Sequence, residues 1–387
     1  MKVLVCGAGI AGLTTSLRLL HGGHDILVVE KAPSLRDEGY MLDFFGPGYD
    51  ASERMGLLPA LEEIHYPIGR LAFLEPDGRE AFSIAYSAYR RLFGGRHFYF
   101  MRGDLEKLLY RKIEGRLPVR FGIAVEHLRE EGERVHVTLS DGEAGSFDLV
   151  VGADGAHSRI RSLIYGEEEQ FRRYLGYVTA AFLADIPKEA PVPDDAFSFL
   201  TIPGRQVGVY PIHGGRLAAF FVYKTSGPPS NIAGEAAVRE IRSKYGGTGW
   251  IVPPLLAQCH PSALFADQVS QIVMPTWSLG RVVLVGDACQ CLSLLTAQGA
   301  SMAVAGGYVL AEELERAGTD VRAALLRYER RIKPTVETVQ ASGRRLGRWF
   351  VPDSPARLTV RNIALRAMAW APAAWAFRPL LAVKRIV

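Results

Sequence analysis

The stretch that decides the fold is KVLVCGAGIAGLTTSLRLLHGGHDILVVE, residues 2–30. An apolar run rich in β-forming residues, KVLVC, leads directly into the glycine turn GAGIAG. The next segment, LTTSLRLLHGG, has apolar residues at helical spacing and ends in two glycines, a helix stop signal. DILVVE is a second β-run. The order strand, glycine turn, helix, strand predicts a βαβ unit of an α/β protein.

The glycine turn has the GxGxxG spacing of a dinucleotide-binding fingerprint. Gly7 permits the tight turn, Gly9 lets the backbone approach a pyrophosphate, and Gly12 lets the helix pack closely on the strand. The helix N-terminus offers free amides and the positive end of its dipole to the phosphates. Glu30, 23 residues after Gly7 and followed by Lys31, is expected to accept hydrogen bonds from a ribose diol. A glycine turn without a ligand is the alternative.

Composition excludes several classes of protein. The chain has 387 residues, of which 48% are hydrophobic and 22% charged, which argues against disorder, collagen and coiled coil. The length favours two domains or three. The four cysteines are too few for a disulfide scaffold and match no common zinc spacing, so we expect a reduced, cytoplasmic protein without a metal site.

Charge is unevenly distributed along the chain. The net charge is +4, but the segment from Ala341 onward carries +8, so the preceding 340 residues carry −4. A mildly acidic body argues against nucleic-acid binding, while the basic tail raises the question of a surface anchor. Residues 288–311 carry no charge but include glutamines, glycines and hydroxyls, so we expect a buried helix with its entry loop rather than a membrane span.

Three further motifs follow the opening βαβ unit. DLVVGADGAHSRIR, residues 148–161, reads as a buried strand, a turn at Asp154 and a helix capped near Ser158. MRGDLEKLL places Arg102 ahead of a short amphipathic helix.

The third motif, RVVLVGDACQCLSLLTAQGASMAVAGGYVLAEEL, covers residues 281–314. It predicts a strand, the pair Gly286-Asp287, a loop, and a long helix that starts near Gln298-Gly299.

Together these motifs resemble the FAD-dependent aromatic hydroxylases of the para-hydroxybenzoate hydroxylase-like type. Among them, the tetracycline-inactivating flavin monooxygenases are the most similar, because EKAPSLRDEGYMLDFFGPGYDASERMGL, which includes Asp43, is similar to their segment after the second strand. The resemblance covers residues 1 to about 340. It implies a Rossmann-type FAD-binding domain, a second, β-sheet substrate domain and C-terminal helices.

The resemblance also implies that the two domains alternate along the chain. We expect residues 1–75, 97–170 and 272–340 in the FAD-binding domain, 76–96 and 171–271 in the substrate domain, and 341–387 in a basic helical tail.

Roles for individual residues follow from the resemblance. It implies that the ADP half of FAD is held by the glycine turn and Glu30, that Arg102 contacts the pyrophosphate and ribityl chain, and that Asp287 binds the ribityl hydroxyls. Gln298 and Gly299 would aim backbone amides at the pyrimidine end of the flavin, where a helix N-terminus stabilises the anionic reduced form. Asp154 belongs to a motif tied to flavin and nicotinamide binding; a helix-capping aspartate is the alternative.

The implied activity is that of an NAD(P)H-consuming monooxygenase, with NAD(P)H as a transient co-substrate. A flavin hydroperoxide would deliver one oxygen atom from O2 to an aromatic or polyketide-like small molecule. Baeyer–Villiger oxygenation, epoxidation and reduction occur on the same fold, so these stay open, as does a flavin-binding accessory protein without turnover. No catalytic residue is identified from the sequence.

Residues 171–225 contain four short strands between proline and glycine turns. The resemblance implies that this sheet roofs the flavin and forms the substrate pocket. Core packing is the alternative for each aromatic residue. Candidate pocket residues are Asp43, Phe182, Phe197, Phe199, Tyr210, Phe221 and Leu294.

The sequence departs from the family in the last motif. Gln290 stands where the family has a histidine, Leu294 where it has a proline, and Thr296-Ala297 where it has small residues or glycine. Proline fixes one backbone dihedral, so we expect a more flexible or differently shaped loop here.

The basic tail has two interpretations. NIALRAMAWA, residues 362–371, looks helical. The tail contains several arginines, among them Arg378, together with Trp370 and Trp375. Such a segment can lie on a membrane surface as a peripheral contact, or it can pack on the substrate domain. We favour packing. Arg36 is a further residue that could approach the flavin edge or the substrate entrance, and an exposed loop arginine is the alternative.

Overall fold

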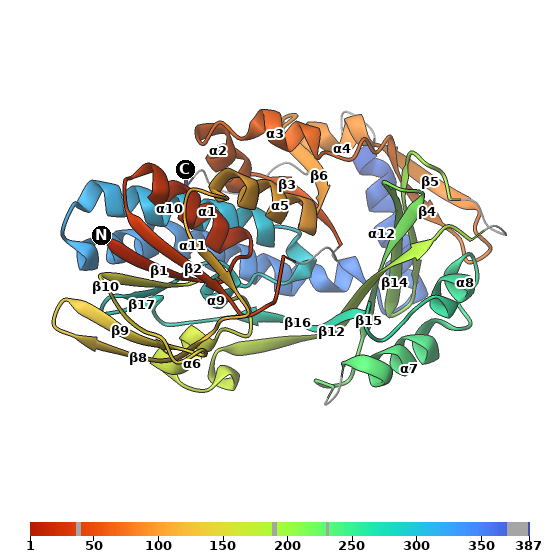
Figure 1. Ribbon diagram of the computed structural model, residues 1–387. Coiled ribbons are helices and arrows are strands. Elements are labelled where there is room, and N and C mark those ends of the chain that lie inside the picture. Colours follow the sequence, from red (N-terminus) through yellow and green to blue (C-terminus); the bar gives the residue numbers. More distant parts are fainter. Residues whose placement is uncertain (36–39, 188–191, 230–231, 370–385) are drawn as a thin grey trace.

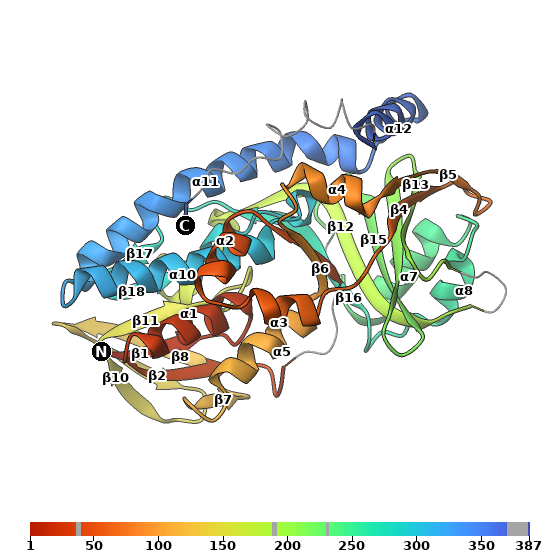
Figure 2. The same ribbon diagram turned by 90° about the horizontal axis from the view of Figure 1, so that it is seen from above.

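The computed structural model describes residues 1–35, 40–187, 192–229, 232–369 and 386–387. The molecule has two parts, each built on its own β-sheet, with two long helices lying along the first part (Figures 1 and 2). Arg36, Trp370, Trp375 and Arg378 lie outside the described residues.

The first part holds a six-stranded sheet in the order β17-β18-β11-β1-β2-β7. Its central strands are parallel, with Val3 paired to Leu149 on one side and Ile26 on the other. The strands are β1 (Lys2–Cys6), β2 (Asp25–Glu30), β7 (Val119–Phe121), β11 (Leu149–Gly152), β17 (Ser278–Leu279) and β18 (Val282–Leu284). Because helices or strands cover both faces, β1 and β11 are continuous apolar runs, as the sequence predicts.

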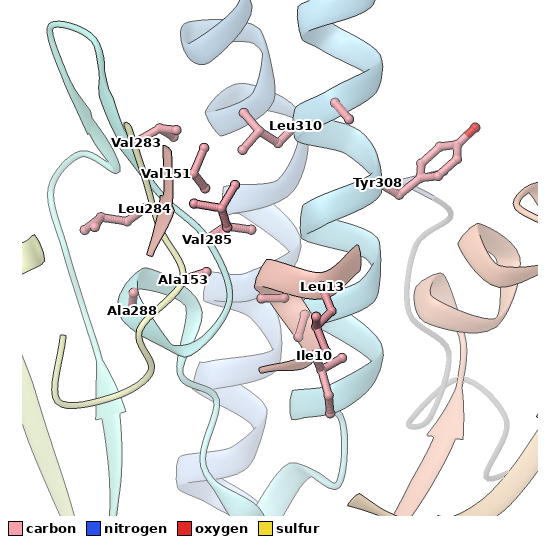
Figure 3. Packing of buried hydrophobic residues seen from close by; sticks show 14 of the residues in the cluster. Ile10, Leu13, Val151, Ala153, Val283, Leu284, Val285, Ala288, Tyr308 and Leu310 are labelled. Atoms are coloured by element: carbon pink, nitrogen blue, oxygen red, sulfur yellow. The ribbon is translucent and has the colours of Figure 1, made fainter. Parts of the chain in front are cut away.

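Helices pack on this sheet through one large apolar core. Leu13 of α1 and Leu310 of α10 belong to this core, and Leu310 lies on the side of the sheet to which Val151 of β11 points, whereas Leu284 of β18 points to the other side (Figure 3). The helices of this part are α1 (Ile10–His21), α2 (Pro47–Arg54), α3 (Leu58–Glu63), α5 (Arg102–Ile113), α6 (Arg159–Tyr165), α9 (Asp287–Gln290), α10 (Gly299–Ala317) and α11 (Val321–Phe350). Short 3₁₀ turns lie at Glu168–Gln170 (η1) and Leu294–Thr296 (η2).

Two small sheets complete the first part. An antiparallel ribbon pairs β3 with β6, and a three-stranded sheet has the order β10-β9-β8. The bounds are β3 (Met41–Phe45), β6 (His97–Met101), β8 (Val125–Glu131), β9 (Arg134–Leu139) and β10 (Ala144–Phe147). The ribbon lies between the two parts of the molecule (Figure 1). The side chains on one face of the ribbon therefore pack against the second sheet.

The second part is a seven-stranded sheet in the order β16-β12-β15-β14-β13-β4-β5. One face packs on α7 and α8, and the opposite face meets the β3–β6 ribbon and α12 (Figure 1). The bounds are β4 (Arg70–Leu74), β5 (Glu80–Ala85), β12 (Arg172–Asp185), β13 (Ala196–Ile202), β14 (Arg205–Ile212), β15 (Arg216–Lys224) and β16 (Phe265–Ile272), with α4 (Tyr86–Leu92), α7 (Gly234–Tyr245), α8 (Val252–Ala257) and α12 (Pro355–Ala369).

Two expected domain boundaries are wrong in the structure. The expected boundary between 75 and 76 separates β4 from its sheet, although β4 pairs with both β13 and β5. The expected boundary between 340 and 341 cuts through α11, which is one continuous helix from Val321 to Phe350. The first error arises because a single five-residue strand carries no signal of which sheet it joins.

The described part of the basic tail packs on the second sheet. Arg361 and Arg366 of α12 lie over the rings of Phe73 and Phe82, and Arg366 also donates to the Ala81 carbonyl. Membrane contact by the rest of the tail stays a prediction. Within the described residues, every helix is too short or too polar to cross a bilayer.

Candidate functional site

At two positions of the glycine turn, neighbouring backbone atoms lie too close to leave room for a side chain. Gly7 has a φ of 114°, and a Cβ there would lie 2.4 Å from the Ala153 carbonyl oxygen. A Cβ on Gly12 would lie 1.9 Å from the Gly7 carbonyl oxygen. Both glycines therefore let β1, α1 and β11 approach one another, as the fingerprint predicts.

The first turn of α1 leaves its amides free for a ligand. Gly9 is the N-cap residue and has no side chain that could accept from the first-turn N–H groups. A Cβ on Gly9 would lie 3.5 Å from Glu106 Oε1 and 4.0 Å from Arg102 Nη2. The turn thus offers an anion the positive end of a helix dipole beside an arginine.

Glu30 is fixed to the same turn. Its Oε2 accepts a hydrogen bond of 2.8 Å from the Ala8 amide, and its Oε1 accepts one of 2.8 Å from the Ala32 amide. Each carboxylate oxygen can accept a further bond. The carboxylate is therefore oriented at the end of β2, where the sequence places a ribose acceptor. Lys31 beside it is exposed.

Arg102 approaches the same turn from α5. Its guanidinium forms an ion pair of 2.7 Å with Glu106, whose side chain is buried one turn further along the helix. The Arg102 amide donates to the Tyr40 carbonyl at 3.2 Å. These two contacts fix both ends of the residue, so the guanidinium is directed by its own helix.

Asp287 is brought next to the α1 turn by the glycine before it. Gly286 has a φ of 63°, and a Cβ there would lie 2.5 Å from the Cβ of Ala11 in α1. The Asp287 side chain is accessible, yet the surrounding protein removes enough water to raise the pKa of its carboxyl. The Arg102 charge acts in the opposite direction, and Asp267 adds to the rise. Arg102 and Asp287 therefore share one electrostatic environment.

The N-terminus of α10 is also open. Gln298 is the N-cap residue, its Oε1 is buried, and it lacks a hydrogen-bond partner among the described residues. A Cβ on Gly299 would meet no atom within 4 Å. An unpaired buried oxygen beside free helix amides fits the polar edge of a bound ring system, which would satisfy both.

Backbone strain marks the loop before α10. Ser293 and Ala297, on either side of η2, have φ values of 79° and 53°, which residues other than glycine rarely adopt. Such strain collects at functional sites. The Leu294 side chain packs beside Leu295 and Tyr177 in a small apolar cluster, so it supports the loop from the side of the second sheet.

Asp154 has the contacts of a helix cap. Its two carboxylate oxygens accept hydrogen bonds from Ser158 Oγ, at 2.5 Å, and from the Ile160 amide, at 3.0 Å. Burial raises the pKa of Asp154. Nearby, the fully buried Arg161 donates to the Ala288 carbonyl at 2.9 Å, which ties this motif to the Asp287 segment.

The expected aromatic walls divide between the two faces of the second sheet. Phe182 and Phe221 stack at 5.5 Å in the core beneath α7 and α8, away from the ribbon, so the expectation that they line the pocket is wrong. Phe197, Phe199 and Tyr210 lie on the opposite face, toward the ribbon. Residues alternate between the two faces along a strand, and Phe182 and Phe221 occupy positions that point to the face covered by α7 and α8.

Tyr210 also fastens the ribbon to the sheet. Its hydroxyl accepts a hydrogen bond from the Met41 amide of β3 and lies 3.5 Å from the Met101 sulfur of β6. Burial raises the pKa of Tyr210. Tyr210 is thus an anchor between the two parts as well as a candidate wall residue.

Asp43 belongs to a polar cluster on the ribbon. Its Oδ1 accepts a hydrogen bond of 3.0 Å from Tyr89 and lies 3.1 Å from Nε2 of the fully buried His97. The other ring nitrogen of His97 lies 3.0 Å from the Tyr86 hydroxyl. The strand begins beside Arg102 and ends where Ser301 of α10 donates to the Phe45 carbonyl, so Asp43 lies between two parts of the candidate site.

Sequence reasoning missed several residues of this arrangement. Glu106 was detectable, because it follows Arg102 by four residues on one helix. Arg161 lies within a recognised motif, but its burial is a tertiary property. His97 has no sequence signal, since its partners come from β3 and α4.

Gln290 and the nearby thiols are core residues. Gln290 replaces the family's histidine, and its Nε2 donates to the Tyr328 hydroxyl at 2.5 Å. Its Oε1 is buried without a partner among the described residues. Burial raises the pKa of the Cys289 and Cys291 thiols, which keeps them protonated and unreactive.

Several known proteins with similar sequences or structures are flavoproteins. The sequence matches an FAD-binding domain family over residues 84–342 and a second one over residues 2–38. It is 34% identical to an uncharacterized protein of Mycobacterium tuberculosis, covering 91% of this chain and 93% of that protein. It is 31% identical to a flavin-dependent monooxygenase from an unknown prokaryotic organism, covering 92% and 91%.

Two solved structures show the same fold. The tetracycline destructase Tet(55) superposes with a TM-score of 0.83 at 28% identity, covering 95% of each chain. HpxO of Klebsiella pneumoniae, in complex with FAD and uric acid, superposes with a TM-score of 0.82 at 24% identity, covering 98% of this chain and 96% of that one. These similarities confirm the Rossmann-type FAD-binding domain, the second β-sheet domain and the C-terminal helices. The chain belongs to the FAD-dependent monooxygenases of the aromatic hydroxylase type, which bind FAD and act on small molecules.

Proposed function

We propose that this chain consumes NAD(P)H and transfers one oxygen atom from O2 to an aromatic or polyketide-like small molecule. The observation that carries the proposal is the convergence of Glu30, Arg102 and Asp287 on the first turn of α1. An aromatic face of the second sheet lies across the ribbon from this turn. Similar proteins include a tetracycline destructase and HpxO with uric acid, both associated with ring compounds.

The first turn of α1 and Glu30 would hold the ADP half of FAD. The free amides bind the pyrophosphate, because their dipole favours an anion. The Glu30 carboxylate is oriented by two backbone amides and accepts the ribose hydroxyls with its remaining lone pairs. Gly9 keeps this approach open, since a Cβ would point at Glu106 and Arg102.

Arg102 and Asp287 would hold the middle of the cofactor. The guanidinium, aligned by Glu106, donates to phosphate oxygen, and the Asp287 carboxylate accepts from the ribityl hydroxyls. The Asp287 side chain is exposed at the start of α9, so its carboxylate is accessible to a bound ligand.

The N-terminus of α10 would hold the reactive end. The bound cofactor supplies hydride acceptance and oxygen activation. The α10 amides after Gln298 would stabilise negative charge at the polar end of the bound flavin. The strained loop from Ser293 to Ala297 fixes where the helix begins, and therefore where these amides point.

The test starts from the purified protein with its flavin. We expect a flavin absorbance spectrum, reduction by NADPH or NADH, and faster nucleotide oxidation when a substrate is added. A panel of polyphenols, tetracyclines and purines is incubated under ¹⁸O₂, and a product heavier by one labelled oxygen identifies the reaction. Nucleotide oxidation without labelled product from any compound favours the reductase alternative. No reduction by either nucleotide favours the accessory alternative.

A variant of Asp287 tests the cofactor site itself. Asp287→Ala removes one charged hydrogen-bond acceptor, so we expect FAD binding about tenfold weaker or more. Asp25→Ala, an exposed position at the start of β2, is the matched control and should bind FAD normally. Unchanged FAD affinity in Asp287→Ala would remove this residue from the site.

A further inference from the structure

Arg361 is a buried cation in the basic tail. It lies in α12, and only 7% of its surface is exposed, whereas Arg357 and Arg366 of the same helix are exposed. Taking a guanidinium out of water costs several kcal/mol unless an anion or a full set of hydrogen bonds compensates. The position therefore demands a compensating partner.

The partners of Arg361 are all neutral. Its Nη1 donates to Thr201 Oγ1 at 3.1 Å and to Gln206 Oε1 at 3.2 Å, and its Nη2 donates to Asn362 Oδ1 at 2.8 Å. Burial lowers the pKa of Arg361 to about 10, and no carboxylate among the described residues offsets this. Beyond Asp353 the sequence contains no further acidic residue.

A second buried arginine shows what ordinary compensation looks like. Arg161 is fully buried, and its Nη2 pairs with the Glu168 carboxylate at 2.9 Å. It serves structure alone by donating to two backbone carbonyls as well. Arg361 has similar burial but lacks the acid, so one charge on this face of the sheet is unmatched within the described residues.

Aromatic rings connect Arg361 with the loop before α10. The guanidinium lies 5.9 Å from the Phe73 ring centroid, Phe73 stacks on Phe199 at 5.4 Å, and Phe199 meets Phe220 at 6.2 Å. Phe220 packs in the same cluster as Leu294. A row of rings therefore leads from the proposed reactive end of the site to an uncompensated cation.

Gln206 adds a second donor beside the cation. Its Oε1 accepts from both Thr201 and Arg361, which leaves its amide nitrogen without a hydrogen bond among the described residues. A planar anion that reached the guanidinium could accept from this amide as well. Arg and Gln donors side by side suit an oxygen pair such as a carboxylate or an ionised 1,3-dicarbonyl.

We propose that Arg361, with Gln206, binds the oxyanion of an aromatic substrate whose rings lie along Phe73, Phe199 and Phe220. The anion is a carboxylate or an ionised enol or phenol, which share the same planar acceptor chemistry. This assignment rests on the proposed function, because it names the substrate class of that same site. It makes the basic tail part of substrate recognition.

The experiment compares an acid with its neutral amide on the FAD-loaded protein. The probes are 1-hydroxy-2-naphthoate and 1-hydroxy-2-naphthamide, and binding is measured by titration calorimetry. We expect the wild-type protein to bind the acid about tenfold more tightly or better, since a hydrogen bond to a charged group is worth that much. Equal affinity for the two probes, or binding of neither, overturns the proposal.

Variants then assign the preference to Arg361. Arg361→Gln should lose the preference for the acid, and Arg361→Lys should keep part of it, because the charge remains while the forked geometry is lost. Arg357→Gln, an exposed arginine paired with Asp353, should keep all of it. A preference that survives in Arg361→Gln overturns the assignment, and the wild-type comparison stands even if that variant fails to fold.

The outcome is separable from that of the proposed function. FAD content and reduction by NADPH without substrate are expected to be the same in the control Arg357→Gln and the wild type. If the wild-type protein binds the acid preferentially but never oxygenates any compound, the anion site stands and the oxygenase proposal falls. If oxygenation occurs without preference for acidic compounds, the reverse holds.

Discussion

The glycine turn before α1 is shaped by backbone atoms, whereas the aromatic face of the second sheet is shaped by side chains. At Gly7 and Gly12 of the turn, backbone atoms leave no room for a Cβ, and the groups offered to a ligand are amides and a helix end. On the second sheet, aromatic rings form the face against which Arg361 of α12 packs, and the backbone only decides which face each side chain meets. A site made of backbone tolerates almost no substitution, whereas a site made of side chains can be changed one residue at a time.

The largest effect should follow from filling the glycine turn. Gly12→Val places side-chain atoms against the Gly7 carbonyl oxygen, which a Cβ alone would approach to 1.9 Å. Relief of this overlap requires α1 to move away from β1, so we expect a loss of at least about 3 kcal/mol in unfolding free energy together with loss of FAD. Urea denaturation and flavin absorbance measure the two effects.

Gly247→Ala is the control for that experiment. A Cβ at Gly247 meets no atom within 4 Å, so its unfolding free energy should stay within about 0.5 kcal/mol of the wild type. A Gly12→Val protein that keeps both its stability and its FAD would show that the turn is not limited by backbone contacts.

The next effect separates the two faces of the second sheet. Phe221 is fully buried between Phe182 and Tyr245 beneath α7, so Phe221→Ala should cost about 3–5 kcal/mol of unfolding free energy. Phe199 is only half-buried, so Phe199→Ala should cost less. Because Phe199 faces the ribbon, its loss should raise the KM for substrate, whereas Phe221→Ala should leave KM unchanged in the folded fraction.

Denaturation and steady-state kinetics on the same preparations decide between the faces. If Phe221→Ala raises KM and Phe199→Ala does not, the face beneath α7 is the one that meets substrate. That result would restore the expectation from the sequence that the structure contradicts.

The contrast between turn and sheet explains what the sequence could and could not predict. The βαβ unit, the Gly286-Asp287 turn and the start of α10 at Gly299 are local patterns, and each was predicted close to its position. The strands of the second sheet were also predicted, because alternation and turn residues are local signals. Which face meets the ribbon depends on pairing with elements far along the chain, so Phe182 and Phe221 were assigned to the wrong side.

Buried polar residues show the same limit. His97 and Arg361 are fixed by partners 54 and 160 positions away, on β3 and β13 respectively. In the sequence, Arg361 is one basic residue of a basic tail, and only its packing against Thr201 and Phe73 distinguishes it from Arg357. Charge counting only raises the question of a surface role for the tail, whereas the structure packs α12 on the aromatic face of the second sheet.

The smallest effect concerns the strained loop, where backbone conformation and side-chain identity disagree. Ala297 has a left-handed conformation, with a φ of 53°. The aromatic hydroxylase family has glycine or a small residue in this part of the motif. The left-handed conformation costs an alanine about 1–2 kcal/mol, while glycine loses about 0.4–1 kcal/mol through greater freedom of the unfolded chain. Ala297→Gly should therefore raise the unfolding free energy by about 0.5 kcal/mol, whereas Ala341→Gly, within the right-handed helix α11, should lower it by about 0.5–1 kcal/mol. Opposite signs in paired urea titrations would show that strain is stored next to α10. Equal losses in both variants would mean that the loop relaxes in solution, and the position of the α10 amides would then have to be fixed by other contacts.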